Sequence, residues 1–198
     1  MPIVRCATSN PGKLREFRIA AGHLGFREIE ILPLDDLKSI APPAEEGDTF
    51  EENAIEKALY YSVFCEDPLF ADDSGLEVDA LGGEPGVYSA RYAGPSATDR
   101  DNNRLLLEKV RDKTDRTARF VCVIALAQRG KLLGTFRGAV EGRIIDEERG
   151  PYGFGYDPMF YYEPFGYTFG EAAADRKMTV SHRGAALSAM LKSIAGAA

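Results

Sequence analysis

The spacing of hydrophobic and polar positions predicts a chain that mixes strands with helices. Short apolar or alternating segments, typical of strands, are 3–8, 28–32, 68–71, 119–128 and 131–141. The last two meet at Gly130, which predicts a hairpin. Helical spacing of apolar residues covers 13–24, 49–64, 98–110 and a final stretch that begins near Ser181. This mixture predicts an α/β fold with a largely mixed sheet, whose strand order the pattern leaves open.

Local signals support these segments and their boundaries. Thr49 and Glu52 form a capping-box pattern at the start of the helix predicted over 49–64. The segments 35–47 and 82–86 are expected to be loops, because they are rich in proline, glycine and acidic residues. No repeat, low-complexity tract or linker interrupts the pattern. Residues 1–198 are therefore expected to form a single domain, or two lobes that share a core.

The charge balance narrows the possible partners. The chain has 198 residues, of which 44% are hydrophobic and 28% charged, with a formal net charge of −7. An acidic chain is a poor candidate for binding a nucleic-acid polymer, for which a basic stripe is expected. It can still bind one nucleotide, because such a site needs only a few local cations and a metal ion.

Cysteine usage and hydropathy favour a cytoplasmic protein. Cys6, Cys65 and Cys122 are far apart and show no metal-binding spacing, so we expect buried, reduced thiols. The first residues lack the apolar core of a signal peptide. The longest apolar run, 120–127, is too short to span a bilayer. No membrane partner is expected.

The first candidate site lies between the strand predicted over 3–8 and the helix that follows. It consists of Thr8, Ser9, Asn10, Pro11, Gly12 and Lys13. Phosphate oxygens favour N–H donors, the positive end of a helix and a lysine. The segment is not a P-loop, because it lacks that motif's first glycine and Leu14 replaces its Ser or Thr. Considered alone, an ordinary turn with a solvated Lys13 is slightly favoured.

The second candidate site is Asp72-Asp73-Ser74-Gly75, which follows the apolar segment 68–71. Two adjacent acids at a strand end repel each other unless a cation lies nearby. Mg²⁺ prefers carboxylate oxygen and takes few protein ligands, leaving water and phosphate to complete its shell. A carboxylate here could also orient or deprotonate an attacking water. The alternative is a solvated turn, and the apolar strand and further acids nearby favour the metal site.

The third candidate site combines an acidic loop with the next helix. Glu45 or Glu46 could be a second metal ligand. Asn53 and Lys57 are four residues apart, so they share one helical face, from which Lys57 could neutralise phosphate charge. Considered alone, a flexible acidic loop beside a surface helix is favoured.

Two further segments have the chemistry to hold a base. In 153–158, Phe154 could stack on a purine and Asp157 could hold a basic partner, whereas an aromatic hairpin packed in the core is equally compatible. Ser181 is a good N-cap, which places His182 and Arg183 in the first turn of the last helix. Cations there oppose the helix dipole, so an anionic or carbonyl partner is expected. For His182 the alternative is a capping or core histidine.

No residues suggest a covalent nucleophile. The chain offers no Ser-His-Asp or Cys-His arrangement, and Ser74 lacks the Gly-x-Ser-x-Gly pattern. Metal-assisted attack by water is therefore favoured over covalent catalysis.

Six motifs in order resemble the inosine/xanthosine triphosphate pyrophosphatase family, also called the non-canonical purine NTP pyrophosphatase or HAM1-like family. They are SNxGK (9–13), GDTFEENA (47–54), ADDSGL (71–76), PGVYSARY (85–92), GFGYDP (153–158) and SHRG (181–184). Each motif alone is weak, but the series extends from Val4 to Leu191. The resemblance implies a two-lobed α/β fold with a long mixed central sheet flanked by helices, an active cleft between the lobes, and a homodimer. It also implies Mg²⁺-dependent cleavage between the α and β phosphates, with Mn²⁺ as a possible substitute.

The resemblance also implies a role for each matching residue. Asp73 would be the general base and a metal ligand, and Glu45 another ligand with Glu46 as its rival. Ser74 and the catalytic Lys57 would contact phosphate. Residues that would bind phosphate are Thr8, Ser9, Asn10, Pro11, Gly12 and Lys13. Residues that would hold the base and the triphosphate are Phe154, Gly155, Tyr156, Asp157, Lys177, His182 and Arg183. The match is least regular at Pro11, which removes one N–H, and at Lys177, whose alignment rests on its distance from His182.

The implied substrates are purine nucleoside triphosphates such as ITP, dITP and XTP. Arg183 could favour a 6-oxo group, and adenine would leave that arginine unpaired. Guanine shares the 6-oxo group, so its rejection must arise at the 2-amino side. The alternatives are a pyrophosphatase for other modified nucleotides and a nucleotide sensor without catalysis.

Overall fold

The computed structural model describes residues 3–26 and 28–196. Within these ranges the strands are β1 (Ile3–Cys6), β2 (Glu30–Pro33), β3 (Leu69–Val78), β4 (Thr117–Gln128), β5 (Lys131–Ile144), β6 (Phe160–Tyr162) and β7 (Tyr167–Thr168). The α-helices are α1 (Pro11–His23), α2 (Phe50–Tyr61), α3 (Asp99–Val110), α4 (Ala174–Met178) and α5 (His182–Gly196). Short 3₁₀ helices are η1 (Leu37–Ser39), η2 (Ser62–Phe64), η3 (Asp79–Leu81), η4 (Gly86–Arg91) and η5 (Asp157–Met159).

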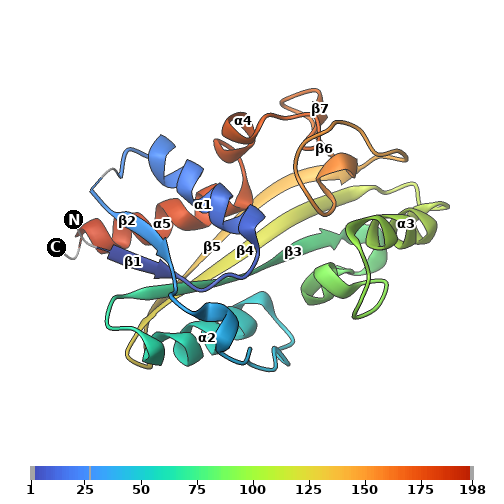
Figure 1. The fold of residues 1–198 in the computed structure, drawn as a ribbon. Coiled ribbons are helices and arrows are strands. Elements are labelled where there is room, and N and C mark those ends of the chain that lie inside the picture. The colour runs from blue at the N-terminus through green and yellow to red at the C-terminus, as the bar shows by residue number, and fades with distance from the viewer. Residues whose placement is uncertain (1–2, 27, 197–198) are drawn as a thin grey trace.

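The strands form one mixed sheet in the order β2-β1-β3-β4-β5-β6-β7 (Figure 1). β1 is parallel to both β2 and β3, whereas every pairing from β3 to β7 is antiparallel. The predicted mixed α/β fold, with helices flanking a long central sheet, is confirmed. In the part of the chain that the structure describes, no helix is long and apolar enough to cross a membrane.

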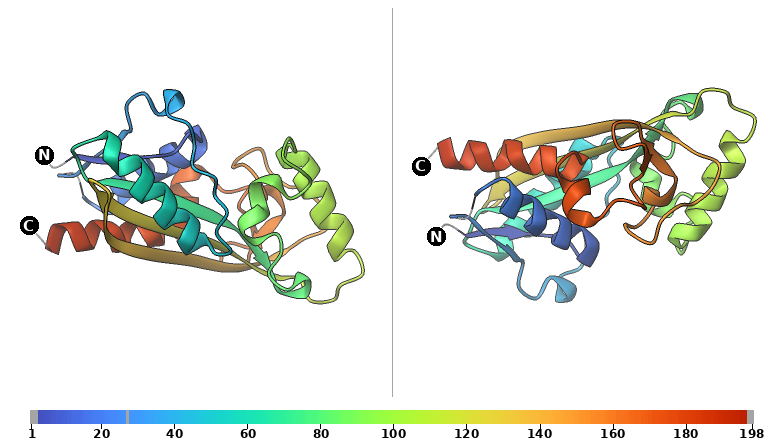
Figure 2. Two further views of the ribbon diagram at one scale, coloured as in Figure 1. Left: turned by 90° about the horizontal axis from the view of Figure 1, so that it is seen from below. Right: turned by 90° about the horizontal axis from the view of Figure 1, so that it is seen from above.

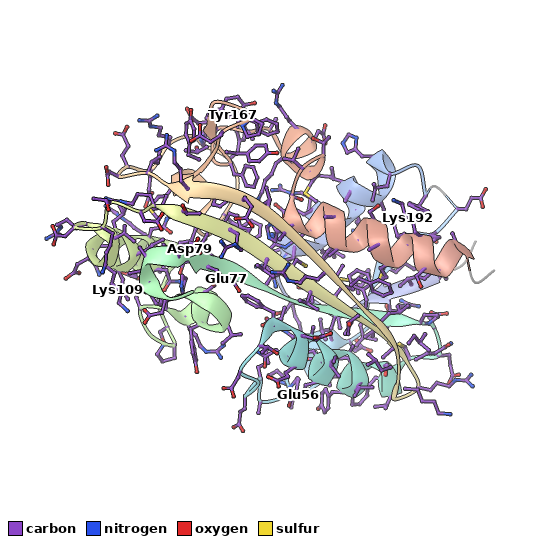
Figure 3. The ribbon with its side chains drawn as sticks, turned by 180° about the vertical axis from the view of Figure 1, so that it is seen from behind. Glu56, Glu77, Asp79, Lys109, Tyr167 and Lys192 are labelled. Carbon is purple, nitrogen blue, oxygen red and sulfur yellow. The ribbon has the colours of Figure 1, made fainter. Side chains whose placement is uncertain are left out.

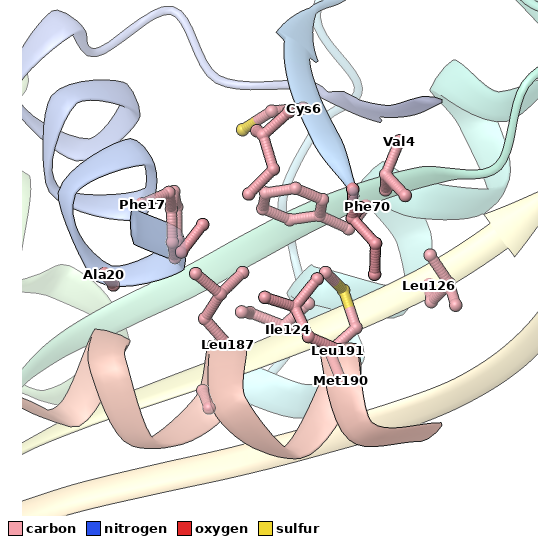
Figure 4. Close-up of a cluster of buried hydrophobic side chains, with 14 of the residues drawn as sticks. Val4, Cys6, Phe17, Ala20, Phe70, Ile124, Leu126, Leu187, Met190 and Leu191 are labelled. Carbon is pink, nitrogen blue, oxygen red and sulfur yellow. The ribbon is translucent and has the colours of Figure 1, made fainter. Parts of the chain in front are cut away.

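Helices cover both faces of the sheet (Figure 2). α1 and α5 pack on one face, where Phe17, Phe70, Leu187 and Met190 belong to one buried cluster (Figure 4). α2 covers the other face with a second cluster. Each large apolar side chain buried this way contributes about 1.5–3 kcal/mol. The charged sides of these helices face outward, as Glu56 and Lys192 illustrate from opposite sides of the sheet (Figure 3).

A third buried cluster lies at the other end of the sheet, under α3 and the β6–β7 segment. β3 contributes to all three clusters, with Phe70 in the first, Leu69 in the second and Leu76 in the third. Its polar residues 72–74 lie between these apolar positions. The middle of β3 is therefore where the packed parts of the molecule meet.

The largest difference from the sequence prediction concerns β3. The segment 68–71 was expected to end before the acids, but the strand continues to Val78. β4 pairs with it throughout, so that Asp72 lies opposite Ile124 and Asp73 opposite Val123. This tertiary pairing overrides the turn preference of Asp, Ser and Gly, which the local sequence cannot reveal.

The other boundaries shift by a few residues. α1 begins at Pro11, which suits a first helical position because proline lacks the N–H that is unbonded there. The helix predicted over 49–64 ends as α2 at Tyr61 and continues as η2. The Thr49 capping box is confirmed. The loop predicted over 35–47 contains the short η1.

Close packing of α5 on β5 gives a test of this fold. A Cβ on Gly138 would lie 2.2 Å from the carbonyl oxygen of His182 and 2.6 Å from the nitrogen of Ala186. We expect Gly138→Ala to lower the free energy of unfolding by about 1–3 kcal/mol, because backbone must move to admit the methyl group. Urea denaturation measures this change. Gly134→Ala on the same strand is the control, since its Cβ meets only the Phe136 side chain, at 3.2 Å. Equal effects of the two substitutions would contradict the described packing.

Candidate active site

One cavity of about 480 Å³ brings most of the predicted site residues together. Those that line it are Thr8, Ser9, Asn10, Lys13, Glu45, Lys57, Asp72, Asp73, Ser74, Phe154, Gly155, Tyr156, Asp157, His182 and Arg183. Pro11 and Gly12 lie beside it in the first turn of α1, and Lys177 is buried behind Asp157. Glu46 is exposed and outside the lining, so the geometry favours Glu45 over its rival. The lining residues come from η1, α1, α2, β3, η4, α3, β4, η5 and α5 and from loops between them.

The turn between β1 and α1 is held by its own side chains. Asn10 caps α1 by accepting hydrogen bonds from the N–H groups of Gly12, at 2.8 Å, and Lys13, at 3.2 Å. The Thr8 hydroxyl accepts one from the N–H of Asn10. The cap thus uses N–H groups that were predicted to bind phosphate. Thr8, Ser9, Asn10 and Lys13 are the polar residues of this turn that line the cavity.

Asp72 is neutralised on one side of β3. Its carboxylate accepts hydrogen bonds from Lys13 Nζ, at 2.8 Å, and from the Ser74 hydroxyl, at 3.1 Å. Burial raises the pKa of Asp72, but the charges of Lys13, Arg183 and Lys57 outweigh it and hold that pKa below its usual value. Asp72 is therefore an ionised anchor for Lys13.

Asp73 has a different environment. Its two carboxylate oxygens accept separate hydrogen bonds, from Lys57 Nζ at 2.9 Å and from Asn53 Nδ2 at 3.2 Å. Burial raises the pKa of Asp73 by more than Lys57 lowers it, so the pKa lies above its usual value. Of the two neighbouring acids, Asp73 is the stronger base.

The acidic loop reaches the same point through Glu45. Lys57 Nζ bonds Glu45 Oε2 at 3.1 Å while it also bonds Asp73, so one ammonium group joins the two carboxylates. Burial lowers the pKa of Lys57, but Asp73, Asp72 and Glu45 raise it by more. Asn53 and Lys57 share a helical face, as predicted, and both are buried rather than on a surface helix.

A buried ion network borders the cavity beside Phe154 and Ser74. Arg183 Nη1 and Lys177 Nζ each donate to Glu16, both at 2.8 Å, and Lys177 also donates to Asp157 at 2.6 Å. The Phe154 ring centroid lies 5.1 Å from the Arg183 guanidinium and 5.3 Å from Lys177 Nζ. Arg183 Nη2 donates to Ser74, which joins this end of the cavity to β3. The anionic partner expected for Arg183 is Glu16.

His182 is buried and has two free ring nitrogens. Its ring stacks on Phe120 with centroids 4.9 Å apart, and no group in residues 3–26 and 28–196 bonds either nitrogen. Burial, with the charges of Arg183 and Lys177, holds the pKa of His182 well below its usual value. His182 lines the cavity as a neutral imidazole, whose two buried ring nitrogens are one donor and one acceptor.

Sequence reasoning missed Glu16 and gave Asn53 no role. Glu16 is an acid among the buried residues of α1, beside Phe17 and four residues before Ala20. The available signal was the position of this acid next to the apolar face of the helix. An acid there would be buried, and a buried acid is rarely found without a charged partner. Asn53 was noted only as a neighbour of Lys57.

Residues 4–193 match the sequence pattern that defines the Ham1 family. The chain belongs to the Ham1 family. Among Ham1 relatives, a protein of Thermus thermophilus named dITP/XTP pyrophosphatase is 50% identical over 188 residues, covering 94% of this chain and 88% of that protein. One of Acidobacterium capsulatum with the same name is 46% identical over 199 residues, covering 96% and 97%.

Solved Ham1 structures have the same fold. The Ham1 protein of Staphylococcus aureus superposes with a TM-score of 0.86 at 38% identity, over 99% of this chain and 100% of that one. A HAM1 protein from Coxiella burnetii gives a TM-score of 0.87 at 39% identity, with the same coverage. The architecture described above is therefore that of the Ham1 family.

Glu16 offers a test of the buried ion network in this Ham1 protein. Glu16→Gln removes the negative charge shared by Lys177 and Arg183, and we expect it to lower the free energy of unfolding by about 3–5 kcal/mol. Chemical denaturation measures the change. Glu163→Gln, in an exposed pair with Arg143, is the control and is expected to have no measurable effect. A Glu16→Gln variant as stable as this control would show that the network contributes little to folding.

Proposed function

We propose that the chain hydrolyses non-canonical purine nucleoside triphosphates, such as ITP, dITP and XTP, to the monophosphate and pyrophosphate. The observation that carries this proposal is the polarity of one cavity. Asp73, with a raised pKa, and two lysines line this cavity together with Phe154, His182 and Arg183. A triphosphate and a purine base need these two kinds of surface. Ham1 relatives named dITP/XTP pyrophosphatase support the same assignment.

The phosphate end provides the groups for attack by water. Asp73 would orient the water and accept its proton, because its carboxylate is more basic than that of its neighbour Asp72. Lys13 and Lys57 would offset the negative charge that develops on the phosphates as pyrophosphate leaves. Ser74 would contact phosphate from the same strand.

Mg²⁺ is the metal that this end of the cavity would suit. Glu45 and Asp73 each direct one oxygen toward Lys57 Nζ. The distances from that nitrogen are 3.1 Å to Glu45 and 2.9 Å to Asp73, so the two carboxylates converge. In the described residues no three His, Cys, Asp or Glu side chains gather as a metal cage. Two carboxylates agree with Mg²⁺, which keeps water and substrate phosphate as its other ligands. Bound there, Mg²⁺ would withdraw charge from the phosphates, and Mn²⁺ would substitute for it.

The other end of the cavity would select the base. Phe154 offers a face for stacking, and its neighbours Lys177 and Arg183 are fixed by Glu16. Arg183 would favour a 6-oxo acceptor. The imidazole of His182 would favour the same acceptor in the tautomer whose proton is on the nitrogen nearer to the base. Adenine presents a donor at this position and would not accept a hydrogen bond from Arg183, which carries a penalty in binding.

Pyrophosphate release tests the proposed reaction. We expect release from ITP, dITP and XTP to exceed that from GTP and ATP, and EDTA to abolish it. Asp73→Asn should lower kcat by about 10²–10⁴-fold while the protein stays folded. Asp112→Asn, on an exposed turn, is the matched control. Nucleotide binding without any pyrophosphate release would favour a nucleotide sensor. Preference for modified pyrimidine nucleotides would favour a pyrophosphatase for other modified nucleotides. Either result would overturn the proposal.

We further propose that the protein acts in the cytoplasm as a homodimer. Free, buried Cys6 and Cys122 are in keeping with a reducing compartment. β5 pairs with β6 only at Arg143 and Ile144, so in the described chain the rest of its outer edge has no strand beside it. Such an edge is a surface on which a second copy can pair.

Light scattering during size-exclusion chromatography tests the dimer. We expect a mass about twice the 21.7 kDa of one chain, independent of loading over a wide range. A mass of one chain at every concentration would contradict this proposal and leave the proposed chemistry intact.

A further inference from the structure

One buried side chain joins the acidic loop to the catalytic strand. Asn53 of α2 is 1% exposed, and its amide contacts both segments. Its Oδ1 accepts a hydrogen bond from the N–H of Gly47 at 2.9 Å. Its Nδ2 donates to Asp73 Oδ2 at 3.2 Å and to the Gly47 carbonyl at 3.4 Å. Both amide hydrogens and one acceptor site are thus used to connect Asp73 with the loop that carries Glu45.

The loop is built for this contact. A Cβ on Gly47 would lie 2.8 Å from Asn53 Oδ1, so only glycine permits the backbone to approach the amide this closely. Two residues earlier, Glu45 has a φ of +51°, a left-handed conformation that residues other than glycine rarely adopt. Such a conformation persists only where neighbouring contacts enforce it. The paired hydrogen bonds between Gly47 and Asn53 fix the backbone of that loop two residues after Glu45.

The contacts of Asn53 differ from those of Lys57. Lys57 binds the Glu45 carboxylate and Asp73 Oδ1 directly, so it competes with any other cation for those oxygens. Asn53 instead uses Asp73 Oδ2 and the backbone of Gly47. Asn53 therefore makes no claim on the Glu45 carboxylate or on Asp73 Oδ1, the oxygens that Lys57 now holds and that a metal ion would share.

We propose that Asn53 is a positioning residue that holds Glu45 and Asp73 at the separation needed to bind a divalent cation together. It touches neither substrate nor the reacting water. Partners that orient metal ligands in this way are commonly worth about 10–100-fold in metal affinity or activity. The inference rests on the proposed Mg²⁺-dependent function, because that function supplies the reason for the two carboxylates to converge.

Two variants separate the contacts. Asn53→Leu keeps the approximate shape of the side chain and removes all three hydrogen bonds. Gly47→Ala leaves Asn53 in place, but its Cβ would push the loop away from Oδ1. Ser62→Ala is the matched control for lost stability, because Ser62 is a fully buried polar residue just after α2 that bonds Leu59 and Gly130 far from the carboxylates.

The first measurement is the Mg²⁺ concentration that gives half-maximal pyrophosphate release from ITP. We expect Asn53→Leu to raise it about 10–100-fold, and Gly47→Ala to raise it in the same direction. KM for ITP at saturating Mg²⁺ should change much less. Ser62→Ala should lower Tm without moving the Mg²⁺ dependence. If Asn53→Leu behaves like Ser62→Ala, Asn53 is only structural and the proposal is overturned; if it does not fold, Gly47→Ala decides.

The second measurement needs no catalysis. Titration with Mg²⁺ alone raises Tm by an amount that reports binding to the folded chain. The rise should occur at higher Mg²⁺ concentration in Asn53→Leu and Gly47→Ala than in the natural chain and Ser62→Ala. A natural chain that shows this rise but releases no pyrophosphate would refute the proposed function and retain the role of Asn53. Unchanged titrations in both variants would refute that role alone.

Discussion

Two adjacent carboxylates in the interior of β3 impose the constraint around which the site is organised. Consecutive side chains of a strand point to opposite faces, so Asp72 and Asp73 each bond a lysine from a different helix. Lys13 from α1 serves the first and Lys57 from α2 serves the second. Burying either carboxylate without its cation would cost several kcal/mol. The helix layers on both faces of the sheet must therefore dock correctly for either acid to be tolerated.

The same arrangement gives the two acids different chemistry. Burial raises the pKa of both acids, but at Asp72 the charges of Lys13, Arg183 and Lys57 outweigh it, whereas at Asp73 they do not. Two neighbouring aspartates thereby have different roles: Asp72 holds Lys13, and Asp73 is the stronger base. The pKa values of the two acids differ because the cations outweigh burial at Asp72, whereas burial outweighs the cations at Asp73.

Much of this could be predicted from the sequence, because the signals are local. Apolar spacing located the main helices and strands, and Thr49 and Ser181 marked two helix starts, since a hydroxyl that caps a helix acts within three residues. The cavity also gathers residues from five of the six motifs. Spacing on one helix correctly placed Asn53 and Lys57 on the same side.

The remainder depends on contacts between distant segments. The continuation of β3 through its acids is dictated by β4, some fifty residues later. Glu16 is separated from Lys177 by 161 residues and from Arg183 by 167, so no local pattern connects them. These separations also order events during synthesis. The lysines and acids of the phosphate end emerge from the ribosome well before α5, which completes the base-binding end. In a nascent chain that still lacks α5, Glu16 is without Arg183. Only docking of this last helix brings the base-binding residues to the residues that act on phosphate.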